Sequence, residues 1–199
     1  MAYVVYTLLV AFFSVVHNDI VDAQSPTHWG RCPQHVPAVE LDLEKFQGLW
    51  YEVERTFYVF ELLAVCPRFN FTLLDDGSLE VQFFMKNRVY QDTNVYTGEV
   101  VPERKNPSVW DVRPKTSLPS MISRILPGSG KYYVLDTDYD NFAILWSCSN
   151  MGLMHSDLIW ILGRDKKISP LHRSLIYSTL DSFKIDDGRL TLSKQKDCD

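Results

Sequence analysis

Short stretches of alternating apolar and polar residues follow one another along most of the chain. The pattern is clearest where Leu79, Val81, Phe83 and Met85 are separated by Glu80, Gln82, Phe84 and Lys86. A period of two predicts strands that bury one face. Similar β-rich runs, most of them bounded by turn residues, are Leu49–Phe57, Arg68–Leu74, Leu79–Lys86, Asn94–Val101, Val109–Val112, Lys131–Asp136, Phe142–Cys148, Leu158–Gly163 and Arg189–Ser193. The turn signal is strongest at residues 75–78, where Gly77 supplies a positive φ without steric cost.

One segment near the C-terminus has the pattern of a helix instead. Ser169 is a favourable N-cap and Pro170 suits the first helical position. The apolar stripe that follows consists of Leu171, Leu175, Ile176 and Leu180, and it must pack against another element. Many short strands and one late helix predict an all-β fold, namely an antiparallel up-and-down barrel with the helix packed outside. A β-sandwich is the alternative that periodicity alone leaves open.

The N-terminus has the features of an export signal. Residues 4–16 form an apolar run of thirteen residues, which is short for a membrane span, and small residues precede Gln24. We therefore expect residues 1–23 to be a cleaved signal peptide and residues 24–199 to form a single domain that is secreted into the extracellular space. A buried N-terminal strand is the alternative interpretation.

Charge and cysteine content narrow the function classes. The net charge is −5 without a basic cluster, which argues against a nucleic-acid partner. The four cysteines suit two disulfides in an exported protein, and their number alone leaves three pairings open. The chain has no CxxC pair and its histidines are scattered, so we expect no metal site. Asn70 begins a sequon, Asn-Phe-Thr, and is the predicted glycosylation site.

Three motifs make the fold prediction specific. Residues 42–52 contain Gly48-Leu49-Trp50, residues 137–139 read Thr137-Asp138-Tyr139, and Arg164 ends a strand-like run just before the helix. Together, in this order, they resemble the lipocalin family, and within it the apolipoprotein D-like and insect Lazarillo-like members. This resemblance implies an eight-stranded barrel with a C-terminal helix outside.

The resemblance also implies roles for individual residues. The cysteine pairs would be Cys32–Cys148 and Cys66–Cys198. Trp50 would fill the floor of the barrel, with Arg164 across its indole face in a cation–π contact. Gly48, Thr137, Asp138 and Tyr139 complete this structural motif rather than a ligand site.

A lipocalin is expected to bind and transport a small hydrophobic molecule, such as a fatty acid, a sterol or retinoid, or a biliverdin-like pigment. We expect no enzyme activity: a disulfide at Cys66 would remove the one candidate thiol nucleophile. We also expect no obligatory cofactor, although a bound lipid or pigment is compatible with the resemblance.

Strand alternation then predicts which side chains line the ligand cavity. A glycan on Asn70 must point outward, which turns Phe69, Phe71 and Leu73 inward. Two-residue steps back from Arg164 place three further residues on the inner face. The full set of predicted ligand-binding residues is Phe69, Phe71, Leu73, Met85, Tyr96, Trp110, Leu158, Trp160 and Leu162. β-Bulges can reverse this alternation locally.

Two loops predicted at the open end are unusually apolar. They are Phe57–Val65 and Leu118–Leu126. They could close over the cavity as a lid, or contact a membrane, a lipoprotein or a partner protein. The second possibility defines the alternative function: a secreted interaction or inhibitor protein that acts through these loops, with a vestigial cavity.

Overall fold

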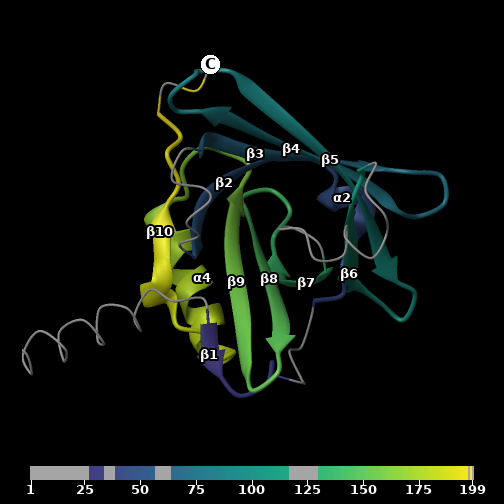
Figure 1. Ribbon diagram of the computed structural model, residues 1–199, viewed down its shortest axis with the longest axis vertical. Helices are drawn as coiled ribbons and strands as arrows, with labels where there is room; N and C mark the ends of the chain where they lie inside the picture. Colours follow the sequence, from purple (N-terminus) through teal and green to yellow (C-terminus); the bar gives the residue numbers. More distant parts are fainter. Residues whose placement is uncertain (1–26, 34–38, 57–63, 117–129, 197, 199) are drawn as a thin grey trace, which may run out of the picture.

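Ten strands of the described chain form one antiparallel sheet that closes into a barrel (Figure 1). The computed structural model describes residues 27–33, 39–56, 64–116, 130–196 and 198. The strands are β1 (Thr27–Trp29), β2 (Gly48–Thr56), β3 (Ala64–Leu73), β4 (Leu79–Asn87), β5 (Thr93–Glu103), β6 (Asn106–Pro114), β7 (Gly130–Thr137), β8 (Phe142–Met151), β9 (Met154–Gly163) and β10 (Leu190–Leu192). The helices are α2 (Leu43–Phe46), α4 (Pro170–Ser182) and the 3₁₀ turn η2 (Asp187–Arg189).

Closure of the barrel depends on one pairing between strands far apart in sequence. Strands β2 to β9 each pair with the next, and β9 then pairs with β2. This confirms the predicted eight-stranded barrel and excludes the sandwich alternative. We call the end where β2 begins the floor, and the end where β2 finishes and β8 turns into β9 the mouth.

The barrel wall separates two apolar clusters. The inner cluster is built around the rings of Phe46, Trp50, Phe71 and Trp110. The outer cluster lies between the wall and α4 and is mainly aliphatic, with Ile144, Ile159, Ile161, Ile176 and Leu180 almost completely buried. Figure 1 shows α4 outside the barrel. Neighbouring residues on one strand therefore belong to different cores, as strand alternation requires.

Helix α4 begins where the sequence predicts it. The Ser169 side chain accepts a hydrogen bond from the His172 N–H, and Pro170 is the first helical residue. The predicted apolar stripe is only half right: Ile176 and Leu180 are buried, whereas Leu171 is 76% and Leu175 50% exposed. The helix needs only a narrow apolar face because it touches a convex barrel wall, so its first turns leave leucines in solvent.

The C-terminal segment is tied to the wall beyond β10. Thr191 and Leu192 pair with Arg55 and Glu54 of β2, and the Lys194 carbonyl accepts from the Cys66 N–H. The disulfides are Cys66–Cys198 and Cys32–Cys148, the pairs that the resemblance implies. The segment thus lies between the end of β2 and the start of β3.

A β-bulge in β2 changes which side chains point inward. Glu52 pairs with Leu162 of the inner cluster, but Glu54 pairs with Ile161 of the outer cluster, so the register shifts between them. Two successive residues, Val53 and Glu54, therefore face outward. Alternation then resumes with the opposite parity.

Candidate functional site

The floor of the barrel is packed solid with aromatic rings. Trp50 is fully buried, and its indole N–H donates to the Phe46 carbonyl oxygen at 2.8 Å. The Phe46 ring lies 5.2 Å from both Trp50 and Trp110 and 5.3 Å from Phe71, measured between ring centroids. Such tilted and edge-on contacts are favourable beyond the area that they bury.

Arg164 fastens the floor from outside the barrel. Its guanidinium carbon lies 3.7 Å from the centroid of the Trp50 ring. Its N–H groups donate to the carbonyl oxygens of Lys45, Gln47, Leu49 and Tyr139 at 2.8–3.0 Å. Gly48 has a φ of +97°, and a Cβ there would lie 3.3 Å from Arg164 Nη1. The Gly-x-Trp motif therefore serves a close backbone approach to this arginine.

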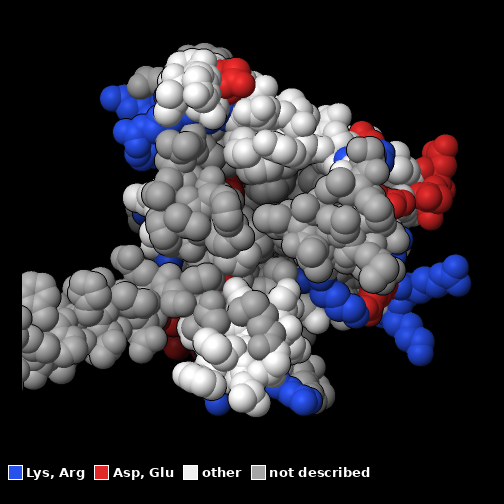
Figure 2. All heavy atoms as spheres, in the orientation of Figure 1, with Lys and Arg blue, Asp and Glu red and all other residues white. Residues whose placement is uncertain are grey.

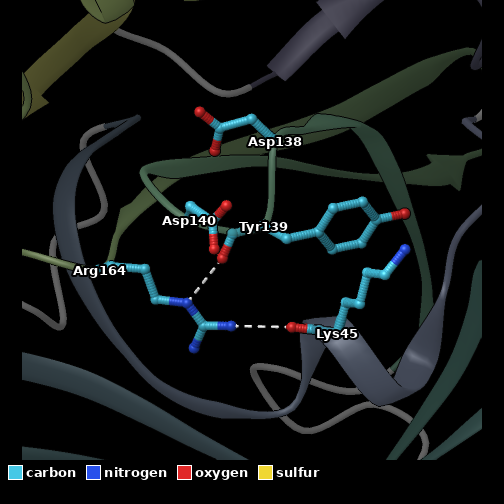
Figure 3. A pocket seen from close by; sticks show the side chains of 5 residues that line it. All are labelled: Lys45, Asp138, Tyr139, Asp140 and Arg164. Carbon is cyan, nitrogen blue, oxygen red and sulfur yellow. Dashed lines mark hydrogen bonds between the residues drawn. The ribbon is translucent and has the colours of Figure 1, made fainter.

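A surface hollow lies beside Arg164 and is lined by Lys45, Asp138, Tyr139, Asp140 and Arg164 (Figure 3). Two of its charged side chains have partners elsewhere in the protein: Asp138 accepts from the N–H groups of Asn141 and Phe142, and Lys45 pairs with Asp42. Thr137 donates to the Phe142 carbonyl and accepts from the Tyr139 N–H. These contacts give the Thr137-Asp138-Tyr139 motif a structural role in the β7–β8 turn.

One aromatic row crosses the inner face from floor to mouth. Centroid distances of 6.2, 4.7 and 6.4 Å link Phe71 to Phe69, Phe69 to Phe83, and Phe83 to Tyr96. Phe71 is buried in the floor, whereas Tyr96 is 53% exposed. Met85 follows Phe83 on the same face of β4, as alternation requires. Phe83 belongs to this row although it was not among the predicted residues.

A second aromatic group lies on β7 and β9. The Tyr132 and Trp160 rings stack with their centroids 5.2 Å apart, and both pack partly buried against the inner cluster. Leu162 is fully buried nearer the floor, and Leu158 lies on the same face nearer the mouth. The structure thus brings aromatic and aliphatic surface together on two sides of the interior.

The predicted ligand-binding residues fall into two groups by depth. Phe71, Trp110 and Leu162 are at most 3% exposed within the packed floor cluster. Leu73 is also at the floor end, because β3 ends there just before the turn at residues 74–78. Phe69, Met85, Tyr96, Leu158 and Trp160 retain exposed surface. Depth along a strand, which alternation does not report, separates the two groups.

Sequence reasoning missed a charged cluster on the inner face. Glu52 is fully buried, and its Oε1 accepts from Arg55 Nη1 at 2.7 Å and from the Ser193 hydroxyl. Its Oε2 is buried and has no hydrogen-bond partner among the described residues. Burial raises the pKa of Glu52 above its usual value, and the Arg55 charge and the two hydrogen bonds offset only part of that effect.

Counting by two from the inward Trp50 predicts an inward Glu52, so that signal was available in the sequence. The same count also turns Glu54 inward, and this is wrong because of the bulge. Glu54 faces α4 instead, where it accepts from Arg173 Nε at 2.7 Å and from the Tyr177 hydroxyl at 2.6 Å.

Some predictions fall wholly or mainly outside the described residues. They are the signal peptide at residues 1–23, nearly all of Phe57–Val65, and Leu118–Leu126. Asn70 is described: it is half-buried on β3, paired with Leu49 and Gln82. Among the described residues, no group of three histidine, cysteine or acidic side chains is placed to hold a metal ion.

The described part of the mouth exposes apolar side chains. Trp29 on β1 is 78% exposed and Leu153 in the β8–β9 turn is 80% exposed, and the Gly30 N–H donates to the Leu153 carbonyl. Figure 2 shows uncharged surface in this area, in the lower part of the view. In the β4–β5 turn, Val89 is 62% and Tyr90 80% exposed. No described helix is long and apolar enough to cross a membrane.

The chain is similar to known proteins over most of its length. A model of the lipocalin-like domain matches residues 41–195. The chain is 30% identical to apolipoprotein D of Cavia porcellus, covering 96% of this chain and 97% of the relative. It is 24% identical to the Lazarillo protein of Schistocerca americana, covering 82% and 74% respectively.

Solved structures show the same fold at lower identity. Insecticyanin of Manduca sexta superposes with a TM-score of 0.72 at 20% identity, covering 86% of this chain and 89% of that one. Apocrustacyanin C2 gives a TM-score of 0.66 at 17% identity, covering 86% and 92%. From the family match, the coverage of apolipoprotein D and the closed barrel, we conclude that the chain belongs to the lipocalin family.

Proposed function

We propose that this lipocalin binds and transports a small hydrophobic molecule in its barrel, without chemical conversion. The observation that carries the proposal is the row from Phe69 through Phe83 to Tyr96, which faces the interior and gains exposure toward the mouth. Such a lining suits a flat or flexible apolar ligand, because burying apolar surface supplies the affinity and few polar groups are needed to orient it. Fatty acids, sterols, retinoids and biliverdin-like pigments remain candidates.

Transport outside the cell is part of the same proposal. The N-terminal apolar run supports export, and the disulfides Cys32–Cys148 and Cys66–Cys198 suit an oxidising compartment. Because the Cys66 sulfur is in a disulfide, it is not available as a thiolate nucleophile. A glycan on Asn70 would remain outside the barrel, because the neighbouring Phe69 and Phe71 face the inner cluster.

Ligand titration of two matched variants tests the carrier proposal. Trp160→Leu removes an inner ring, and Tyr51→Leu removes an outward ring from β2. We expect Trp160→Leu to weaken binding of retinol or of N-phenyl-1-naphthylamine about tenfold, as a loss of some 1.4 kcal/mol would give, and Tyr51→Leu to leave it unchanged. A wild-type protein that binds neither these probes nor fatty acids, sterols and biliverdin, and shows no thermal stabilisation by any of them, would contradict the proposal.

A second candidate function is contact with a lipid surface through the mouth. The exposure of Trp29 and Leu153 favours it, because exposed apolar groups side by side are unusual on a monomer. We expect the protein to float with liposomes and the double variant Trp29→Ser, Leu153→Ser to stay in solution. The control Leu171→Ser removes a leucine of similar exposure from α4 and should still float. Absence of wild-type flotation, even with anionic lipid, would argue against this function.

A further inference from the structure

The charged cluster inside the barrel contains two buried polar atoms that make no hydrogen bond within the described part of the chain: Glu52 Oε2, an acceptor, and Arg55 Nε, a donor. Glu52 Oε1 receives both available hydrogen bonds, from Arg55 and Ser193, whereas Oε2 is buried without a partner among the described residues. A buried polar atom without a hydrogen bond is costly and rare in native proteins. Because Glu52 is fully buried, bulk water does not satisfy this oxygen, and Oε2 can accept one further hydrogen bond.

The pairing of Glu52 places that polar group on the inner face of the barrel, within the proposed ligand site. Glu52 is one inward step above the Trp50 floor and pairs with Leu162, and Arg55 pairs with Trp160 one step nearer the mouth. The C-terminal segment bridges β2 and β3 beside Glu52, because the Gln195 amide donates to the carbonyl oxygens of Glu52 and Pro67. Within the described residues, Arg55 is the charged side chain that contacts Glu52.

Charge balance decides which polar group fits. A ligand carboxylate next to an ionised Glu52 would place two negative charges side by side in a site of low dielectric constant, which is costly. A ligand hydroxyl adds no charge. It can donate to an ionised Oε2 or accept from a protonated one, so it suits both states of Glu52.

We infer that Glu52, held by Arg55 and Ser193, makes this barrel select apolar ligands that end in a hydroxyl over those that end in a carboxylate. The inference rests on the proposed carrier function and specifies its ligand class. Because Oε2 is covered in this structure, the ligand reaches it through a side-chain rotation at Glu52 or at a neighbour. A carboxylate ligand binds at this position only together with a proton, which converts Glu52 into a hydrogen-bond donor.

The proton requirement gives the selection a defined pH dependence. Affinity for a carboxylate ligand should rise as pH falls, by up to about tenfold per pH unit, which is the slope for uptake of one proton. Affinity for the matching alcohol should stay flat over the same range. The raised pKa of Glu52 brings this transition closer to neutral pH than an exposed glutamate would.

Retinol and retinoic acid form a matched pair of probes for this inference. We expect the wild-type protein at pH 8 to bind retinol at least about tenfold more tightly than retinoic acid, measured by quenching of tryptophan fluorescence. In Glu52→Gln the preference for retinol should be lost or reversed, because the amide keeps the shape without the negative charge and leaves the Arg55 charge to attract the carboxylate. The control Glu54→Gln changes the same group on the outer face and should keep the wild-type ratio.

The outcomes separate this inference from the carrier proposal. A wild-type protein that binds N-phenyl-1-naphthylamine but shows equal affinities for the two retinoids would overturn the inference alone. An unchanged ratio in Glu52→Gln, or a ratio lost equally in Glu54→Gln, would also overturn it. Failure of all three probes to bind would overturn the carrier proposal and the inference with it. Retinoic acid protonates as well, and the pH series in Glu52→Gln isolates that contribution.

Discussion

Glu52 and Glu54 are two buried carboxylates on one strand, and a single bulge sends them to opposite faces of the barrel wall. On the outer face Glu54 has a partner for each oxygen, Arg173 and Tyr177, both from α4. On the inner face Glu52 has two partners on one oxygen and none described for the other. Both oxygens of the outer carboxylate are hydrogen-bonded to the helix, whereas the inner carboxylate has one oxygen without a described partner, which is where we propose that a ligand binds.

The surroundings of the two carboxylates differ in the same way. The outer cluster is mainly aliphatic, and its members are almost completely buried under α4. The inner cluster grades from a packed floor to half-exposed rings toward the mouth. This contrast predicts that substitutions in the outer cluster alter stability alone, whereas substitutions in the inner cluster alter both stability and ligand selection.

The largest change in stability and ligand preference should come from removing the Cys66–Cys198 disulfide. This disulfide holds the C-terminal segment in which Ser193 donates to Glu52. The double variant Cys66→Ser, Cys198→Ser frees the C-terminal segment that carries Ser193. We expect a stability loss of about 2–5 kcal/mol in denaturant unfolding and loss of the preference for retinol over retinoic acid.

The second disulfide provides the control for that experiment. Cys32–Cys148 closes a loop of 116 residues against 132 for Cys66–Cys198, so chain entropy predicts a similar stability loss. Its removal should leave the retinoid preference intact, because it does not hold Ser193. Loss of the preference in both double variants would show that general loosening, rather than release of Ser193, is responsible.

The next largest effect is expected from substituting the residues on β9 that pair with Glu52 and Glu54. Ile161 pairs with Glu54 on the outer face, Leu162 pairs with Glu52 on the inner face, and both are fully buried. Ile161→Ala and Leu162→Ala should each cost about 2–5 kcal/mol, because each leaves a cavity. Retinol should recover part of the loss in Leu162→Ala only. Equal recovery in the two variants, measured by thermal unfolding with and without retinol, would contradict the distinction between the faces.

The fold itself could be predicted from the sequence because its signals are local. Alternation marked the strands, Gly77 marked a turn, and Ser169 with Pro170 marked the start of α4. Elements without such a pattern were missed: β1 is three residues long, and β9 begins at Met154 among polar residues rather than at Leu158. Both rely on pairing with other strands, which the local sequence does not encode.

The candidate site was predicted less completely, for two physical reasons. Alternation placed Phe69 and Trp160 on the inner face, but it carries no information on depth, so Trp110 and Leu73 at the floor were grouped with them. The bulge at Val53 reverses the parity of Arg55, and strict alternation cannot predict such a shift. Counting by two from Trp50 marks Glu52 as inward, but the contact between Glu52 and Arg55 becomes visible only once the strands are paired.

The smallest effect concerns a hydrogen bond on the outer carboxylate. Tyr177→Phe removes the hydroxyl that donates to Glu54 Oε2 and should cost about 1–2 kcal/mol near neutral pH. Desolvation, followed by the hydrogen bond to Glu54 and the Glu54 charge, raises the pKa of Tyr177 from 10.0 to about 12. A raised pKa means that the folded state favours the neutral phenol, so this contribution is complete below pH 10 and is lost as pH rises toward 12.

The wild-type protein and Tyr177→Phe should therefore converge in stability at high pH, as measured by denaturant unfolding at pH 7, 9, 10 and 11. A double-mutant cycle with Glu54→Gln should assign the coupling to this pair, because the two side chains are in direct contact. Neither variant should change the affinity ratio for retinol and retinoic acid. If Tyr177→Phe did change it, the two faces of β2 would be coupled through the bulge, and the separation between a structural and a ligand-selecting carboxylate would not hold.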